Sequence, residues 1–283
     1  MPAPSRLPGR MDAPSRSRRP CRKPWRRPGR RWGFPHARPS TPLPSYERPA
    51  AARPRSLHMT RPPRLAVFDC DGTLVDSQAH ILKAMTAAWR RNGLGDPLPD
   101  QVRRIIGLNL NVAVAELLPD ADAALRDSVV AAYRAAFLAE RQGPEHHEPL
   151  YPGAIEALDR LADGGYRLAV ATGKARRGLL ATLGRHGLVD RFVSLHTADD
   201  GPGKPDPAML YAAMEHSGVA AGETVMIGDT TFDMLMAGAA GVSALGVAWG
   251  YHCAPELKAA GAVFIARDFV ELVDRLTVEK AES

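Results

Sequence analysis

Two carboxylates one residue apart, Asp69 and Asp71, have the type and spacing in this chain that most directly suggest chemistry. They follow an apolar run, 65–68, which predicts a buried strand, and they precede Gly72 and Thr73, which predict a turn. Residues i and i+2 of an extended chain point to the same side. Both acids can therefore face one site at the carboxyl end of the strand.

Carboxylates held this close repel each other, and each raises the pKa of the other unless a cation lies between them. The pair therefore predicts a bound divalent metal ion, a shared proton, or a division into a nucleophile and a general acid. A plain turn is the alternative, since Asp and Gly are ordinary turn residues. Cys70, which lies between the two acids, should point to the opposite face of the strand as a small buried apolar residue.

The elements that must position these acids alternate between strands and helices after residue 152, which predicts a parallel sheet with helices on both faces. The predicted strands are 166–171, 192–195, 224–227, 243–248 and 262–265, and the predicted helices end near 186 and 240 or cover 207–217 and 268–278. Ligands bind beyond the carboxyl ends of such strands. The polar residues expected to converge there are Asp69, Asp71, Thr172, Lys204 (in a loop), Asp229 and Asp233.

This converging set favours phosphoryl transfer. Acids from two strands form an oxygen-rich site that suits Mg²⁺, and Lys204 can neutralise a negatively charged intermediate. The hydroxyl of Thr172 and the amides of 172–174, at a helix start, can hold phosphate oxygens. Each residue alone also has an ordinary structural interpretation as a cap, a solvated charge or a turn residue. Their coincidence at the ends of different strands is what indicates a site.

Residues 77–150 show helical apolar spacing and no strand pattern. Helices are predicted from a cap at Ser77 to about 92, from near 100, over 112–118 and over 123–142. An all-helical insert directly after the first strand predicts a small cap domain at 77–150, and the core domain then consists of 59–76 and 151–283. Within the insert, the residues that could contact a substrate or an anion are Arg103, Arg104, Asn109 and Asn111, although solvated helix termini are their more common role.

The net charge of +6 on the 283 residues is unevenly distributed. Residues 1–58 hold 15 of the 37 Lys and Arg, 13 of the 25 Pro and only two acids, so the remainder carries 22 basic and 29 acidic residues. A segment this rich in proline can neither bury a core nor sustain a helix. We interpret it as a disordered leader, inert or preceding a true start at Met59, in preference to a nucleic-acid-binding arm or an organelle-targeting peptide.

Several classes of protein are disfavoured by what the sequence lacks. Cys21, Cys70 and Cys253 have unrelated spacings, so they indicate neither a disulfide framework nor a metal site. No apolar run is long enough to span a membrane, and the N-terminus lacks the apolar core of a secretory signal. We therefore expect a cytoplasmic setting and a small-molecule substrate, without a membrane partner and with nucleic acid disfavoured.

Four motifs, in order, make the chain resemble the haloacid dehalogenase-like hydrolases, in the subfamily with a helical cap after the first strand. They are DCDGT (69–73), ATGK (171–174), GKPDP (203–207) and GDTTFDM (228–234). The resemblance covers 64 to about 275 and is strongest to the phosphoglycolate phosphatase-like branch. It implies an α/β fold, with a doubly wound, Rossmann-like parallel-sheet core. The chain departs from the family pattern at Gly173, where many relatives have Asn.

The resemblance implies a Mg²⁺-dependent phosphomonoester hydrolase that acts on a small phosphorylated metabolite through an aspartyl-phosphate intermediate. Asp69 would be the nucleophile, and Asp71 would be the general acid and then the general base. Thr172 and Gly173 would hold the phosphoryl group, while Lys204 would offset its charge. The residues implied to hold Mg²⁺ are Asp69, Asp71 through its main-chain carbonyl, Asp229, and Asp233 as a ligand or as the partner of a ligand.

Other activities of the same fold are distinguished by Asp71. Haloalkanoic acid dehalogenases lack this second acid because a halide leaves without a proton. Phosphonate hydrolases of the superfamily also lack it and use a cap lysine, for which this insert offers only Lys83. A β-phosphoglucomutase-like phosphotransferase keeps both acids and stays open as an alternative. So does a nucleic-acid-binding protein that uses the basic leader.

Overall fold

The computed structural model describes residues 64–143 and 147–278, so the predicted leader at 1–58 and Met59 lie outside the described residues. The strands are β1 (Arg64–Phe68), β2 (Tyr166–Thr172), β3 (Ser194–Thr197), β4 (Thr224–Gly228), β5 (Ser243–Val247) and β6 (Phe264–Ala266). The helices are α1 (Gln78–Arg91), α2 (Pro99–Ile105), α3 (Leu110–Leu117), α4 (Ala123–Arg141), α5 (Ala154–Asp163), α6 (Arg176–Arg185), α7 (Ala208–Ser217), α8 (Thr231–Ala240), α9 (Ala254–Ala259) and α10 (Phe269–Val278), with short 3₁₀ turns at Val189–Arg191 and Ala221–Glu223.

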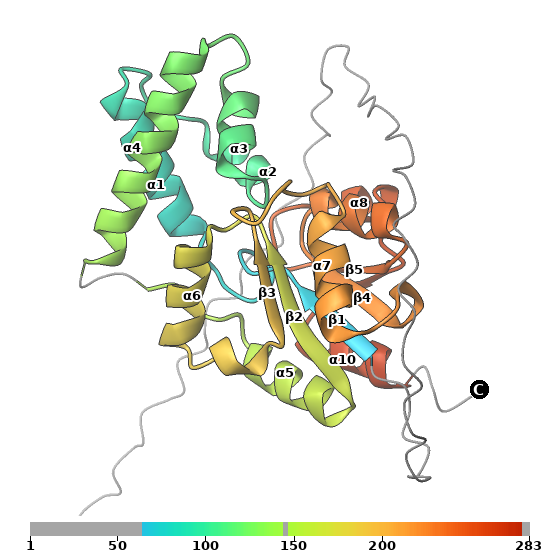
Figure 1. Ribbon diagram of the computed structural model, residues 1–283. Coiled ribbons are helices and arrows are strands. Elements are labelled where there is room, and N and C mark those ends of the chain that lie inside the picture. Colours follow the sequence, from blue (N-terminus) through green and yellow to red (C-terminus); the bar gives the residue numbers. More distant parts are fainter. Residues whose placement is uncertain (1–63, 144–146, 279–283) are drawn as a thin grey trace, which may run out of the picture. The chain divides into compact units, whose positions relative to one another are not determined.

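The strands of the described residues form one parallel sheet in the order β3-β2-β1-β4-β5-β6, so β1 lies between β2 and β4 (Figure 1). Phe68 pairs in register with Val170 of β2 and with Ile227 of β4. Asp69 continues this pairing, because its N–H donates to the Ile227 carbonyl at 2.9 Å. The residues that follow β1, β2 and β4 therefore emerge at one edge of the sheet.

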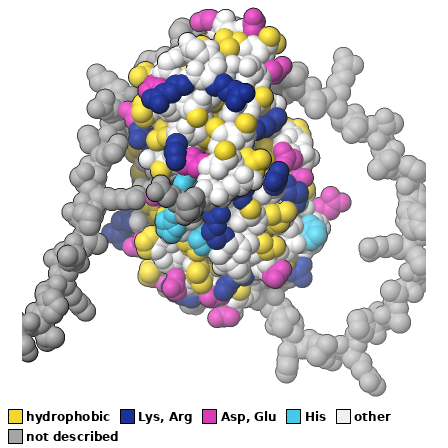
Figure 2. Space-filling model, turned by 90° about the vertical axis from the view of Figure 1, so that its left-hand side faces the viewer, with side chains coloured by type: hydrophobic (Ala, Val, Ile, Leu, Met, Phe, Trp, Pro, Cys, Tyr) yellow, Lys and Arg dark blue, Asp and Glu magenta, His cyan; other side chains and the backbone are white. Residues whose placement is uncertain are grey.

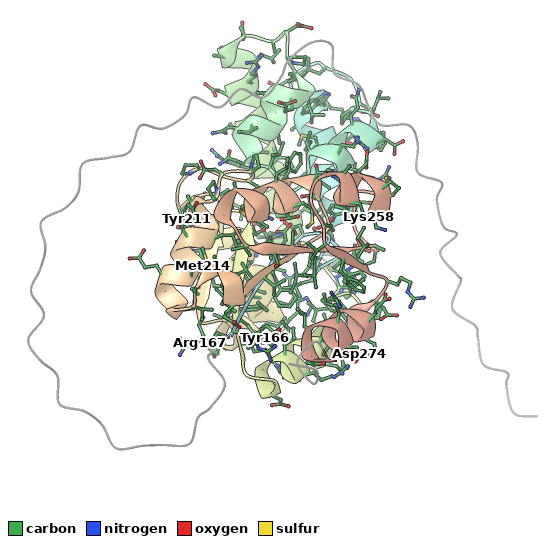
Figure 3. All side chains as sticks on the ribbon, turned by 90° about the vertical axis from the view of Figure 1, so that its right-hand side faces the viewer. Tyr166, Arg167, Tyr211, Met214, Lys258 and Asp274 are labelled. Carbon is green, nitrogen blue, oxygen red and sulfur yellow. The ribbon has the colours of Figure 1, made fainter. Side chains whose placement is uncertain are left out.

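The amino ends of the strands lie at the other edge. Tyr166 and Arg167, at the start of β2, lie on the side of the core away from α1–α4 (Figure 3). There the guanidinium of Arg64 lies 4.0 Å from the centroid of the Tyr166 ring and donates to its hydroxyl at 2.9 Å. This contact ties the amino end of β1 to the start of β2.

Side chains of the central strand alternate between two apolar layers, as the period of a strand requires. Ala66 and Phe68 pack into the layer of α5, α6 and α10, whereas Leu65 and Val67 pack into the layer of α7, α8 and α9. All four are completely buried, and burying one large apolar side chain contributes about 1.5–3 kcal/mol. These two layers confirm the predicted doubly wound α/β core.

Helices α1–α4 enclose an apolar cluster of their own, which includes Ile81, Met85 and Val129. Two chain crossings join this helical segment to the core, and they pair with each other. The Asp76 N–H donates to the Pro149 carbonyl at 2.8 Å, and the Tyr151 N–H donates to the Leu74 carbonyl at 2.9 Å. The described part of 77–150 contains helices and no strand, apart from an isolated bridge between Val75 and Leu150 at the crossings.

Some local predictions were wrong. The edge strand β3 begins at Ser194 and not at Phe192, because Phe192 ends a 3₁₀ turn and the ladder with β2 starts where Ser194 meets Ala169. Helices α5 and α9 were not predicted. Ser77 occupies the position before α1 without capping it through its side chain, and its hydroxyl lies 3.4 Å from the Tyr251 hydroxyl instead.

No helix among the described residues combines the length and the apolar character needed to cross a membrane. On the face shown in Figure 2, the part that grey atoms leave visible mixes small groups of hydrophobic, basic and acidic side chains. Cys70 is completely buried in the apolar layer of α5, α6 and α10, as predicted, and burial raises the pKa of its thiol.

Candidate active site

The turn after β1 places two carboxylates at the carboxyl edge of the sheet, and both Asp69 and Asp71 are buried. Gly72 has φ +91°, a conformation that favours glycine. A Cβ at this position would also overlap the carboxylate of Asp229. The glycine of the first motif is therefore required both by the turn and by the approach of the loop after β4.

Three carboxylates gather beside this turn: those of Asp69, Asp229 and Asp233. One oxygen of each lies within 4.8 Å of the others, and all three side chains are completely buried. Asp229 follows β4 directly, and Asp233 lies in the first turn of α8. The pairing of β1 with β4 is what brings the first and last motifs together.

Lys204, from the loop between β3 and α7, is the cation of this cluster. Its Nζ lies 2.8 Å from Asp69 Oδ1 and 2.6 Å from Asp233 Oδ1, and its side chain is completely buried. The carboxylates Asp69, Asp229 and Asp233 with this one ammonium leave two negative charges uncompensated when all are ionised. Among the described residues, Asp69 Oδ2 has no hydrogen-bond partner.

The electrostatic cost of this arrangement appears in the pKa values. Burial, together with the nearby Asp233, raises the pKa of Asp69 to about 6 although Lys204 lowers it. Burial and the charges of Asp69 and Asp233 raise the pKa of Asp229 well above its usual range. Burial lowers the pKa of Lys204, but Asp233 and Asp69 raise it more, so it remains charged. The cluster is poised to accept a further positive charge.

Hydrogen bonds hold the other two acids in place. Asp229 accepts at Oδ1 from the Thr73 hydroxyl and at Oδ2 from the Tyr251 N–H, each at 2.9 Å. Asp233 accepts at Oδ2 from the Thr230 N–H at 3.0 Å and from its hydroxyl at 2.7 Å, which caps α8. Both carboxylates are thus oriented by their surroundings before any ligand binds.

The donor set fits a hard divalent cation. Carboxylate oxygens are the ligands that Mg²⁺ prefers, and a dication would compensate the two negative charges left by Lys204. The unpartnered Oδ2 of Asp69 is a completely buried anionic oxygen of the kind that a metal ion or an electrophile satisfies.

Thr172 ends β2, is 1% exposed, and accepts at Oγ1 from the Lys174 N–H at 3.3 Å. It pairs with Thr197 of β3 in the ladder, and the register of β1 and β2 places it near the level of the Asp69–Asp71 turn. Helix α6 begins only at Arg176, so the amide of Thr172 belongs to β2 and those of Gly173 and Lys174 to the loop before the helix, not to its first turn.

Gly173 lies against the helical segment. A Cβ at this position would overlap the main-chain carbonyl of Gly107, which lies in the α2–α3 connection, and would crowd that of Leu108. The connection thus occupies the space that a side chain at position 173 would need, which a glycine leaves free.

This approach predicts that Gly173→Ala lowers the free energy of unfolding by about 1–3 kcal/mol, the usual cost of overpacking. The change would be measured by urea denaturation. Gly184→Ala is the matched control, because a Cβ at Gly184 in α6 meets no atom within 4 Å and alanine favours the helix. A Gly173→Ala protein as stable as the wild type would contradict a fixed contact between the two loops.

Asp71 is the one predicted acid outside the carboxylate cluster. Its Oδ1 lies 2.8 Å from the Nζ of Lys174, which also lies 3.2 Å from Glu148 Oε1. Burial lowers the pKa of Lys174, but the charges of Asp71 and Glu148 raise it more. The sequence pattern indicated Lys174 only for its amide and gave no sign of Glu148, because no motif marks an acid in the second chain crossing.

Of the four weaker candidates in the helical segment, three make side-chain contacts elsewhere, and Asn111 is exposed and, within the described residues, contributes only its main-chain N–H. Arg103 pairs with Asp100 on α2, and Arg104 pairs with Glu256 of α9 at 2.6 Å. Asn109 caps α3 by accepting from the Asn111 N–H, and it donates to the Ala198 carbonyl at 3.3 Å. The side chains of Arg104 and Asn109 thus hold the α2–α3 connection to the core.

The chain was also compared with known protein families, curated proteins and solved structures. The family model described as "Haloacid dehalogenase-like hydrolase" matches residues 66–247. "Probable phosphatase IndB" of Dickeya dadantii is 40% identical over 214 residues, which cover 74% of this chain and 91% of that protein. The phosphoglycolate phosphatase of Rhodospirillum rubrum is 34% identical over 224 residues, 76% of this chain and 91% of that protein. A solved Bacteroides fragilis structure, described as a haloacid dehalogenase-like hydrolase, is 28% identical with a TM-score of 0.69 and covers 74% of this chain and 99% of its own.

Proposed function

The chain is a phosphatase of the haloacid dehalogenase-like hydrolase family, and we propose that it hydrolyses a small phosphomonoester through a phosphoryl group carried on Asp69. The observation that carries the proposal is the Oδ2 atom of Asp69. It is a buried carboxylate oxygen without a hydrogen-bond partner among the described residues, in a carboxyl group whose other oxygen is 2.8 Å from Lys204. Such an oxygen is desolvated and free to attack.

In the first step, an Asp69 oxygen forms a bond to phosphorus and the bond between phosphorus and the ester oxygen breaks. The departing alkoxide takes a proton from Asp71, which acts as the general acid. The products of this step are an alcohol and an aspartyl phosphate. Asp71 suits this role because its carboxylate lies two residues from the nucleophile and outside the carboxylate cluster.

In the second step, water attacks the phosphorus of the aspartyl phosphate and gives a proton to Asp71, now the general base. The bond between phosphorus and the Asp69 oxygen breaks, which releases inorganic phosphate and restores both carboxyl groups. Lys204, buried beside Asp69, offsets the negative charge that builds up on the phosphoryl oxygens. Thr172 and the amides of Gly173 and Lys174 hold those oxygens.

The side chains that would hold Mg²⁺ are those of Asp69 and Asp229, with Asp233 as a ligand or as a partner of one, together with the main-chain carbonyl of Asp71. Their support is the cluster of completely buried carboxylates and its uncompensated charge. Bound Mg²⁺ would supply charge neutralisation for the phosphoryl group and for its carboxylate neighbours. Asp233 already bonds to Thr230 and Lys204, which favours the partner role for it.

We further propose that the helical segment takes part in substrate selection. We assign 59–76 and 151–283 to the core and 77–150 to a cap that covers the site. The support is the separate apolar cluster of α1–α4, the paired crossings at Asp76 and Tyr151, and the approach of Gly107 to Gly173. A cap that rests on the phosphate-holding loop can exclude water and contact the leaving group.

The test is Mg²⁺-dependent release of phosphate from a panel of phosphoglycolate, sugar phosphates and nucleoside monophosphates. We expect hydrolysis of a small substrate, with phosphoglycolate as the first choice because of the curated relatives that bear its name. Removal of metal by a chelator is expected to lower kcat at least about 10²-fold, and added Mg²⁺ to restore it. Unchanged activity in excess chelator would contradict the proposed metal dependence.

The same assay separates the phosphotransferase alternative. A β-phosphoglucomutase-like enzyme would convert β-glucose 1-phosphate to glucose 6-phosphate, whereas a hydrolase releases inorganic phosphate. The amounts of glucose 6-phosphate and of inorganic phosphate formed in one time course show whether the phosphoryl group passes to a sugar or to water. Deleting 1–58 addresses the nucleic-acid alternative, since salt-sensitive DNA binding lost on deletion would support it.

A further inference from the structure

Lys174 is a buried cation that the steps above use only for its amide. Its ammonium lies 2.8 Å from Asp71 Oδ1 and 3.2 Å from Glu148 Oε1. The side chains of Asp71, Lys174 and Glu148 are 10%, 6% and 0% exposed. Lys174 thus links the predicted acid/base, Asp71, to Glu148. This charged group is separate from the carboxylates around Lys204.

The far end of this charged group is held by hydrogen bonds. Glu148 Oε2 accepts from the Thr182 hydroxyl of α6 at 2.8 Å, and the Glu148 main-chain carbonyl lies 2.8 Å from the His186 Nε2. On the side of the helical segment, the ring centroid of Phe137 lies 5.3 Å from the Lys174 Nζ, within the range of a cation–π contact. Lys174 is therefore fixed from α6, from the second chain crossing and from α4.

Stability alone is a weak reason for such an arrangement. Burying two carboxylates and one ammonium costs several kcal/mol of desolvation per charge, and apolar residues of similar volume commonly replace buried ion pairs without loss of stability. The three side chains also carry one net negative charge between them. What the arrangement does achieve is a single position for one Asp71 oxygen, while the Lys174 contact leaves the other oxygen of that carboxylate for proton transfer.

We propose that Lys174, held by Glu148, is a positioning residue that fixes the carboxyl group of Asp71 for proton exchange with the leaving oxygen and then with water. This inference rests on the proposed function, because it assumes that Asp71 is the acid/base. It assigns a role to a lysine side chain and to a glutamate that lie 26 residues apart in the sequence and meet only in the fold. Neither residue contacts the phosphoryl group in this role.

The test compares leaving groups. An alkoxide needs a proton to depart, whereas p-nitrophenolate leaves without one, so misplacing Asp71 should harm only the first reaction. We expect Lys174→Met to lower kcat/KM about 10²-fold or more for the best alkyl phosphate of the panel, and less than about 10-fold for p-nitrophenyl phosphate. The ratio kcat/KM is used because it covers only the steps up to formation of the aspartyl phosphate. Lys174→Arg, which keeps the charge, should recover part of the alkyl phosphate activity.

Lys174→Met leaves two buried carboxylates without a cation and so endangers the fold. The double variant Lys174→Met with Glu148→Gln keeps the net charge of the group and should show the same dependence on the leaving group. Lys83→Met is the matched control, because that side chain is 70% exposed on α1 and pairs with Glu140, and it should leave both reactions unchanged. A folded double variant that loses both activities equally, or loses neither, would overturn the inference.

Asp69→Asn in the same assay separates the two possible failures. If that variant keeps wild-type activity on both substrates, the proposed function fails and this inference falls with it. If it is inactive while the Lys174 variants show losses that do not depend on the leaving group, the proposed function stands and the positioning role alone is wrong.

Discussion

Replacing Asp69 by asparagine is expected to lower kcat for phosphate release on the order of 10⁴-fold or more, as removal of a catalytic nucleophile does in other enzymes. The amide keeps the size of the side chain but cannot form the acyl phosphate. Steady-state release of phosphate with saturating Mg²⁺ measures the effect. An acid quench of the wild type during turnover, followed by peptide mass analysis, should find one phosphoryl group on the peptide that contains Asp69.

The matched control is Asp163→Asn, the same change at an exposed carboxylate near the end of α5. It should leave kcat within about 2-fold of the wild type, because the substitution removes a solvated charge and contacts no part of the site. If Asp69→Asn retained more than about a tenth of the wild-type kcat, its carboxylate would not be the nucleophile, since the residual activity would exceed what loss of covalent catalysis allows.

The same variant is expected to be more stable than the wild type when metal is absent. The pKa of Asp69 is raised from 3.8 to about 6, chiefly by burial, so the folded state binds this proton more tightly than the unfolded state does. The stability linked to the protonated form is fully present below about pH 4 and is lost as the pH rises through about 6. At pH 7 the buried charge therefore costs about 3 kcal/mol, which asparagine avoids.

Urea denaturation in excess chelator at pH 4, 5.5 and 7 measures this effect. The free energy of unfolding of Asp69→Asn minus that of the wild type should be near zero at pH 4 and should increase toward about 3 kcal/mol at pH 7. Lys204 keeps its partner Asp233 in the variant, so the substitution leaves no buried ammonium unpaired. Added Mg²⁺ should narrow the difference, because it stabilises the wild type through a site that the variant has weakened. If the variant were less stable than the wild type at pH 7 without metal, the ionised carboxylate of Asp69 would not destabilise the fold.

Gain of stability with loss of activity is the pattern of a functional site. Replacing a residue that serves packing lowers both the stability and the activity of the protein. Replacing a buried charge that serves catalysis lowers the activity but raises the stability, because the charge itself destabilises the fold. The same reasoning applies to Asp229, whose pKa is also raised by burial and by the neighbouring Asp69 and Asp233. The clustered carboxylates at the carboxyl edge of the sheet therefore destabilise the fold when they are ionised, and a bound cation would reduce this effect.

Much of the core followed from local pattern. The apolar run before Asp69 predicted a strand, and the βα alternation after residue 152 predicted a parallel sheet. Only the structure shows that β2 and β4 are the neighbours of β1. Helix α5 carried a detectable helical pattern as well, since Ala157, Leu158 and Leu161 are its buried face. Helix α9 is only six residues long, and its contact with Arg104 is not visible in the sequence.

The site, like the fold, was predictable from the sequence only in part. The four motifs and their convergence were predictable from sequence pattern, because parallel strands bring their carboxyl ends to one edge whatever the details of packing. Which acid meets which cation was visible only in the folded protein: Asp69 contacts Lys204, and Asp71 contacts Lys174 and through it Glu148. Side-chain pairs of this kind depend on rotamers and on the approach of distant segments, which carry no periodic signal in the sequence. The two adjacent acids thus share one turn in the sequence but belong to two different electrostatic environments in the folded protein.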